Sequence, residues 1–139
     1  MGPALLDTDV VSEILRGKNT DVAKHAAEYR REHGRYTLSV VTVVEVIQGF
    51  AREQRDDRIV DFNSRITTEE ILPLDRAAAD VAGRIFGELD RIGQPIGRAD
   101  PLIAAIALRH GLALVTGNVK HFERIVQLGF PLQLTNWRS

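Results

Sequence analysis

Apolar residues follow one another almost without a break between positions 101 and 115, and this stretch makes the clearest structural prediction in the chain. Asp100 followed by Pro101 is typical of a helix start, where the missing N–H of proline costs nothing. The helix that follows is apolar on nearly every side, which predicts that it is buried. Gly111 is placed to end it, and residues 112–115 predict a short parallel strand that is covered on both faces.

Short apolar runs alternate with helical periodicity through the rest of the chain. The predicted strands are residues 4–6, 36–38, 70–74, 112–115 and 131–134. Helices are predicted near residues 10–16, 20–33, 40–51, 59–66, 76–92, 101–110 and 122–126. This alternation is typical of an α/β domain with a short, mostly parallel central sheet that is flanked by helices.

Helix ends and helix faces give more local predictions. The residues placed to cap helices are Thr8 or Asp9 for the first, Ser39 for the third and Asp75 for the fifth. In the third helix the predicted buried stripe is Val41, Val44, Ile47 and Ala51. The charged run 52–58 is interpreted as a solvated junction between two helices.

Composition limits the classes of function. The chain has 139 residues, 44% of them hydrophobic and 27% charged, which predicts one globular domain over residues 1–139. Its net charge of −1 provides no general attraction to nucleic acid, so a nucleic-acid role needs local basic patches. The absence of cysteine excludes disulfides and thiolate metal sites. Neither a signal peptide nor a membrane-spanning run is recognised, so we expect a cytoplasmic protein without a membrane partner.

Three acids lie at the boundaries of apolar elements, namely Asp7, Glu45 and Asp100. Ligands of parallel sheets bind beyond the carboxyl ends of the strands, where Asp7 and residues 116–118 are expected. Two carboxylates 4 Å apart repel each other by about 4 kcal/mol at an effective dielectric constant near 20, so a cation is expected among them. Oxygen ligands without cysteine favour Mg²⁺ or Mn²⁺, and such an ion activates water for phosphodiester hydrolysis.

Each acid also has a purely structural interpretation. Asp7 and Asp100 are suitable helix caps, and Glu45 is able to pair with a surface arginine. The four histidines are interpreted as solvated residues or residues at helix ends. Taken singly, none of these residues therefore identifies an active site.

Four segments together resemble the PIN-domain nucleases, and more narrowly the VapC toxins of toxin–antitoxin pairs. They are residues 5–12 around Asp7, residues 39–50 with Glu45 followed by Gly49, residues 100–105 beginning Asp-Pro, and residues 115–118 leading to His121 and Phe122. The resemblance extends to Trp137. It implies a PIN-like fold, a Mg²⁺- or Mn²⁺-dependent endoribonuclease, inhibition by a VapB-like antitoxin, and a homodimer.

The resemblance also implies roles for individual residues. Asp7, Glu45 and Asp100 match the family's metal ligands, while Thr116 and Thr8 match positions that support the site. Asp7, Glu45 and Asp100 are then the catalytic residues as well, acting through the ion that they hold.

The family usually has a fourth acid at the position of Asn118 or of His121, and this chain has an acid at neither. The amide oxygen of Asn118 is still a possible ligand, so the sequence leaves one or two metal ions open. Arg98, beside Asp100, is a candidate for steering the RNA backbone.

Two other functions remain open at this point. A phospho-acceptor receiver domain also places aspartates at strand ends, although Asp7 and Asp9 form a poor acidic pair for it and Asp100 begins a helix. A PIN fold that binds RNA or a protein without cleavage is the other alternative, because of the missing fourth acid.

Overall fold

The computed structural model describes residues 1–138 and contains seven α-helices, one 3₁₀ helix and five strands within them. In chain order the elements are β1 (Ala4–Leu6), α1 (Thr8–Arg16), α2 (Thr20–His33), β2 (Thr37–Ser39), α3 (Val40–Arg52), α4 (Asp56–Arg65), η1 (Ile66–Thr68), β3 (Glu70–Leu72), α5 (Arg76–Arg91), α6 (Asp100–His110), β4 (Ala113–Val115), α7 (Val119–Gln127) and β5 (Leu134–Thr135). None of the helices within residues 1–138 is long and apolar enough to cross a membrane.

The five strands form one parallel sheet in the order β3-β2-β1-β4-β5, which confirms the predicted fold class. β1 is central and pairs with β4 through the registers Leu5↔Leu114 and Leu6↔Val115. The backbone N–H of Asp7 continues this pairing and donates to the carbonyl of Val115 at 2.9 Å. Residues that follow β1 and β4 therefore meet at one edge of the sheet.

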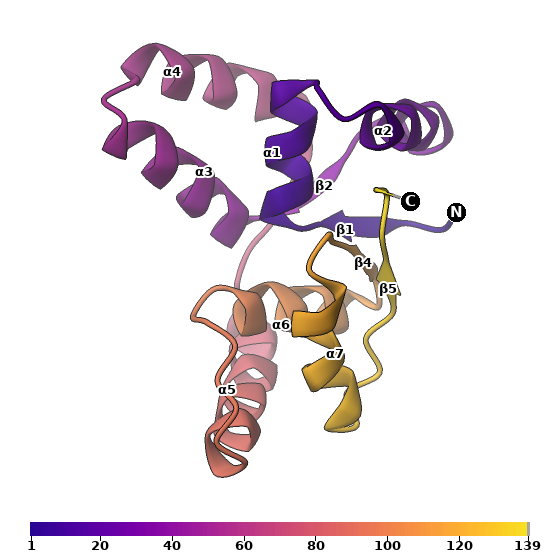
Figure 1. The fold of residues 1–139 in the computed structure, drawn as a ribbon, viewed down its shortest axis with the longest axis vertical. Coiled ribbons are helices and arrows are strands. Elements are labelled where there is room, and N and C mark those ends of the chain that lie inside the picture. The colour runs from indigo at the N-terminus through magenta and orange to yellow at the C-terminus, as the bar shows by residue number, and fades with distance from the viewer. Residues whose placement is uncertain (139) are drawn as a thin grey trace.

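Helices cover both faces of the sheet, and successive strand residues point to opposite sides. Leu5 and Leu114 pack with α5, α6 and α7, which lie below the sheet in Figure 1 and are here called the α5–α7 layer. Leu6 and Val115 pack with α1 to α4 on the other side, here called the α1–α4 layer. The buried Trp137 belongs to the α1–α4 layer, so the end of the chain helps to hold that layer.

The buried central helix predicted from the apolar run is confirmed as α6. Its buried residues are Pro101, Ile103, Ala104, Ala105, Ile106 and Ala107. Gly111 ends the helix in the left-handed conformation with φ 65°. Asp100 is the first helical residue and Ala99 occupies the N-cap position without a side-chain hydrogen bond, so the carboxylate of Asp100 is not used as a cap.

Other local predictions are confirmed in part. Ser39 caps α3 by accepting from the N–H of Thr42, and Asp75 caps α5 by accepting from that of Ala78. Residues 52–58 are all exposed, as predicted for a junction between helices. The last strand was predicted at residues 131–134, but β5 begins only at Leu134 because the chain first makes a turn at residues 130–132.

The predicted buried stripe of α3 is only partly right, since Val41 and Ile47 are half-buried and pack against the core but Val44 and Ala51 are exposed. Thr42 and Val46 are the buried residues of this helix, whereas Val44 is 61% exposed. Thr42 can be buried because its hydroxyl has partners, the Thr8 hydroxyl at 2.9 Å and the Ser39 hydroxyl at 3.3 Å. A pattern based on apolar residues alone overlooks a threonine that is satisfied in this way.

Asp7 occupies the N-cap position of α1, which confirms its structural interpretation as a helix cap and makes the prediction of Thr8 or Asp9 wrong. Asp7 has extended backbone angles, and its side chain accepts from the N–H of Thr8. The helix begins directly after the strand, which leaves Asp9 free for another role.

Candidate active site

Asp7 lies where β1 meets α1 and is only 3% exposed. Its Oδ1 accepts from the backbone N–H of Thr8 and its Oδ2 from the hydroxyl of Thr116, each at 2.8 Å. Burial, followed by the negative charge of Asp9, raises the pKa of Asp7 to about 7, although both hydrogen bonds oppose this shift. Asp7 is therefore a carboxylate that lacks sufficient positive charge nearby.

Asp100 contributes to the same electrostatic field. Burial raises its pKa, a hydrogen bond with His121 lowers it, and the charge of Asp9 raises it further. Nδ1 of His121 lies 2.9 Å from Oδ2 of Asp100. Since the charge of Asp100 also raises the pKa of Asp7, the structure brings these two predicted site residues into one cluster.

Glu45 is connected to Asp7 through Thr8. The hydroxyl of Thr8 donates to Oε1 of Glu45 at 2.5 Å, while its backbone N–H donates to Asp7. Thr42, on the same helix as Glu45, lies 2.9 Å from the Thr8 hydroxyl. Thr8 thus couples the start of α1 to α3, consistent with its predicted supporting position.

Asp9 is the acid that the sequence reasoning missed. Its Oδ2 accepts from the backbone N–H of Gly117 at 2.8 Å, and its Oδ1 is buried without a hydrogen-bond partner among the described residues. Its charge raises the pKa of both Asp7 and Asp100. The sequence did contain a signal for Asp9, namely its spacing from Asp7. Asp7 follows the strand β1 and α1 begins at Thr8, so the side chain of Asp9 turns toward the end of the neighbouring strand β4.

Gly117 permits this approach of Asp9 to the end of β4. A Cβ atom at position 117 would lie 2.6 Å from Oδ2 of Asp9 and 2.9 Å from Nη1 of Arg138. Such contacts are too short for any side chain without movement of the neighbours. Both atoms lie at the ends of side chains, so a larger residue at position 117 would displace the Asp9 carboxylate and the Arg138 guanidinium, and Gly117 leaves room for their present positions.

Two other predicted residues lie at the margin of this cluster. The backbone N–H of Asn118 donates to the Thr116 hydroxyl at 2.9 Å, but the Asn118 side chain is exposed and makes no hydrogen bond to the described residues. Arg98 is exposed in the loop before α6 and forms no ion pair within residues 1–138. The structure thus places the backbone of Asn118, but not its side chain, against the site.

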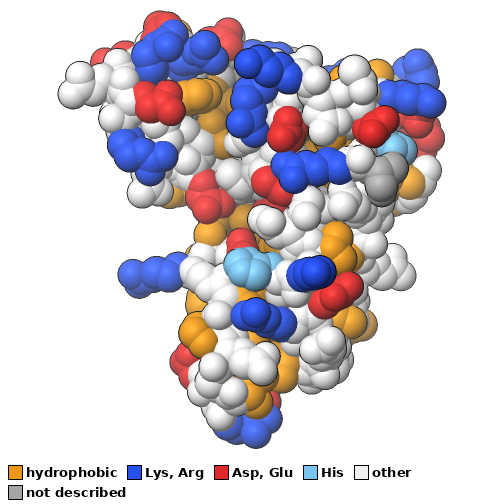
Figure 2. Space-filling model, viewed as in Figure 1, with side chains coloured by type: hydrophobic (Ala, Val, Ile, Leu, Met, Phe, Trp, Pro, Cys, Tyr) orange, Lys and Arg blue, Asp and Glu red, His pale blue; other side chains and the backbone are white. Residues whose placement is uncertain are grey.

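The donor set fits a hard divalent cation. Within residues 1–138 no group of three His, Cys, Asp or Glu side chains is already arranged as a metal site. Mg²⁺ is usually bound by only one or two carboxylates and keeps several waters, so it does not need such a cage. The raised pKa of Asp7 and the unpartnered Oδ1 of Asp9 are both compatible with binding of a cation. Figure 2 shows acidic side chains at the waist between the two layers.

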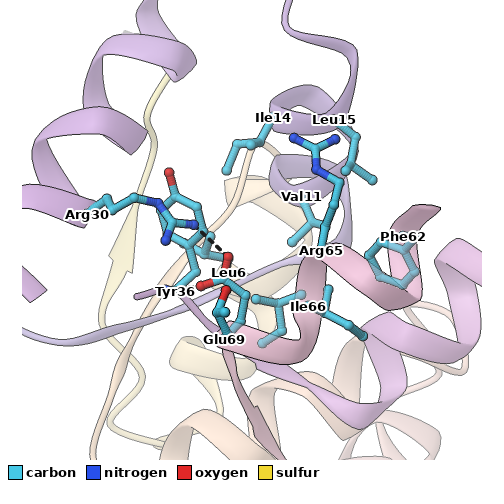
Figure 3. A pocket seen from close by; sticks show the side chains of 12 residues that line it. Leu6, Val11, Ile14, Leu15, Arg30, Tyr36, Phe62, Arg65, Ile66 and Glu69 are labelled. Carbon is cyan, nitrogen blue, oxygen red and sulfur yellow. Dashed lines mark hydrogen bonds and ion pairs between the residues drawn. The ribbon is translucent and has the colours of Figure 1, made fainter. Parts of the chain in front are cut away.

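A separate cavity of about 220 Å³ opens within the α1–α4 layer (Figure 3). Apolar side chains from α1, α4 and η1 line it, among them Ile14, Phe62 and Ile66. The ion pair of Arg30 and Glu69, with 2.6 Å between Nη2 and Oε2, closes one side. The cavity combines apolar walls with a charged rim and is distinct from the acid cluster.

Comparisons with known proteins agree with these features. The PIN domain family model matches residues 4–127. The tRNA(fMet)-specific endonuclease VapC of Shigella flexneri is 35% identical, with 87% of this chain and 90% of that protein covered. Ribonuclease VapC2 of Haemophilus influenzae is 31% identical over 96% of each chain. The crystal structure of DNA-bound VapBC from Salmonella typhimurium superimposes with a TM-score of 0.81 and 29% identity, covering 99% of each chain.

Proposed function

Since the chain belongs to the PIN-domain family, and within it to the VapC ribonucleases, we propose that it is the endoribonuclease toxin of a toxin–antitoxin pair and requires Mg²⁺ or Mn²⁺. The observation that carries the metal requirement is the buried Asp7, whose pKa is raised to about 7 by burial and by neighbouring acids. Family membership excludes the receiver domain that the sequence had left open.

Asp7, Glu45 and Asp100 would hold the ion, and Asp9 adds a fourth carboxylate to the cluster. A divalent ion held there would supply positive charge to the scissile phosphate and would activate water as the nucleophile. The resemblance to the family implies products with 5′-phosphate and 3′-hydroxyl ends.

The residues around the acids keep them oriented before RNA arrives. Thr8 and Thr116 fix the two oxygens of Asp7, so its carboxylate cannot rotate freely. Thr8 also holds Glu45, and His121 holds one oxygen of Asp100. This preorganisation reduces the rearrangement that binding of a cation and a phosphate would otherwise require.

The antitoxin partner is supported by the neighbouring structure, which is a VapBC complex. An amphipathic antitoxin segment fits the apolar cavity near Ile14 and Phe62, since helices commonly bind such grooves by their apolar face. From there a basic antitoxin residue would reach into the acid cluster and neutralise it. The homodimer implied by the family stays a prediction, which sedimentation of the isolated protein tests.

The direct test of the activity is cleavage of total RNA by the purified protein. We expect cleavage with Mg²⁺ or Mn²⁺, none with EDTA, and a loss of at least about 100-fold in the Asp7→Asn variant, because an amide replaces the charge that holds the ion. Asp90→Asn is the matched control, since Asp90 is exposed on α5 and makes no ion pair within the described chain. Cleavage that survives EDTA, or that is unchanged in Asp7→Asn, contradicts the mechanism.

The alternative function, a PIN fold that binds RNA or a protein without cleaving RNA, is suggested by the absence of an acid at positions 118 and 121. It predicts that RNA binds while no divalent metal supports cleavage. An assay with Mg²⁺, Mn²⁺ and Co²⁺ on protein freed of antitoxin separates the two functions.

A further inference from the structure

A groove of about 510 Å³ leads away from the candidate active site along the junction of α3 and α4. We propose that this groove binds the phosphate backbone of the RNA substrate, an inference that rests on the proposed ribonuclease function. Thr8 and Glu45 line one part of the groove. Four arginines line it as well, namely Arg16, Arg52, Arg55 and Arg58.

The charge of this groove is unlike that of the chain as a whole, whose net charge is −1. Two of its arginines are partly neutralised, because Arg55 pairs with Asp57 at 2.8 Å and Arg16 lies 3.4 Å from Glu13. Arg52 and Arg58 are exposed and form no ion pair among residues 1–138. They remain available for an anion.

The groove also contains acids, but the position of Glu45 at its active-site end is compatible with binding of an RNA backbone. Besides the four arginines, Glu45 and Glu53 are its charged lining residues. Glu45 is partly occupied by the Thr8 hydroxyl and belongs to the acid cluster. The groove therefore changes from acidic, where a metal ion would be held, to basic along α3 and α4, and Figure 2 shows basic side chains gathered at that end of the molecule.

The backbone of the α3–α4 junction, beside this groove, contains a strained residue. Gln54 has φ 57° and is the only residue other than glycine with positive φ in residues 1–138. A left-handed conformation is unfavourable for a residue with a Cβ, and such strain is concentrated at functional sites. The turn links Arg52, at the end of α3, to Arg55 and Arg58 around the start of α4.

Phosphate is the ligand that best matches these features. Arginine presents planar N–H donors that bind phosphate oxygens in pairs. A polyanion that approaches the carboxylates of Asp7 and Asp100 is repelled, and basic contacts on the neighbouring nucleotides offset that repulsion. A groove that begins at Thr8 and Glu45 and runs along α3 and α4 binds the nucleotides on one side of the acid cluster.

The test measures binding of a fluorescein-labelled single-stranded oligoribonucleotide in EDTA, by anisotropy at several salt concentrations. The variant is Arg52→Gln with Arg58→Gln. Each phosphate contact on a single strand contributes about 0.7 to the slope of log K against log salt, so the slope is expected to decrease by about 1.4. At 0.1 M salt the same relation corresponds to an affinity about 25-fold lower.

Arg31→Gln with Arg76→Gln is the matched control, since both residues are exposed, lie outside the groove and form no ion pair within the described chain. It should retain the slope and affinity of the unmodified protein. With Mg²⁺ present, the groove variant should show a raised KM and an unchanged kcat, because its acid cluster is intact. Equal thermal unfolding midpoints for both variants exclude misfolding.

If the unmodified protein cleaves RNA but the groove variant and the control have equal salt slopes, the proposal that the groove binds RNA is wrong. The proposed ribonuclease function is not affected by that result. A groove variant that binds RNA normally but loses its antitoxin also overturns the proposal, because the groove then binds protein. If the unmodified protein neither binds nor cleaves RNA, the proposed function itself fails.

Discussion

The two helical layers cover opposite faces of one sheet, yet they are packed very differently. In the α5–α7 layer, α6 is buried on nearly every side and α5 packs against it through Ala82, Ile85 and Leu89. The α1–α4 layer contains the apolar cavity and the basic groove, and it exposes Val44 and Val60 by 61% and 70%. The closed layer provides stability, while the open layer keeps surface free for binding, and the acid cluster lies where they meet.

The largest expected effect comes from replacing one isoleucine in each layer, which tests the difference in packing directly. Ile106→Ala in α6 should lower the free energy of unfolding by about 2 to 5 kcal/mol, because Ile106 is fully buried and its removal leaves a cavity. Ile14→Ala in α1 should cost about 1 kcal/mol, since its side chain is partly exposed and already borders a cavity. Urea unfolding of both variants provides the measurement. Equal losses would show that the two layers are packed alike.

A second prediction concerns the boundary between the layers. The pKa of Asp7 is raised from 3.8 to about 7, so between these pH values the folded protein retains a proton that the unfolded chain has released. Stability from Asp7 is thus fully present below about pH 4 and is lost as pH rises toward 7, by up to about 4 kcal/mol at about 1.4 kcal/mol per pKa unit. Asp7→Asn should remove this loss.

Urea unfolding in EDTA at about pH 5 and pH 7 measures the effect as the difference between the variant and the unmodified protein. Adding Mg²⁺ at pH 7 should stabilise the unmodified protein and leave Asp7→Asn unchanged, because a ligand stabilises only the state that binds it. An identical pH dependence of the two proteins would mean that the pKa of Asp7 is not raised in the folded protein.

The prediction with the smallest expected effect compares two residues that adopt the left-handed backbone conformation. Gly111 ends α6 with φ 65°, whereas Gln54 adopts φ 57° in the open layer. Gln54→Gly should raise the free energy of unfolding by about 1 kcal/mol, and Gly111→Ala should lower it by about as much, since only glycine adopts this conformation without a steric penalty. Thermal unfolding compares them, and a destabilised Gln54→Gly variant would contradict the strain inferred at the α3–α4 junction.

The same contrast explains how far the sequence could be interpreted. The closed layer follows from apolar periodicity and glycine stops, so α6 and its buried face were predicted correctly. In the open layer, burial depends on hydrogen bonds between distant residues, such as that of Thr42 with Thr8, which no local pattern contains. Asp9 was missed for a related reason, because its partner Gly117 is 108 residues away.

The hydrogen bond between Asp7 and Thr116 spans 109 residues of sequence and has a consequence for synthesis of the protein. A ribosome makes Asp7 109 residues before it makes Thr116, which follows β4 and orients the Asp7 carboxylate. Contacts between such distant residues form late in folding, after the intervening chain has been closed into a loop. A nascent chain that does not yet include Thr116 therefore lacks the assembled acid cluster, and the translating ribosome is not exposed to it during that interval.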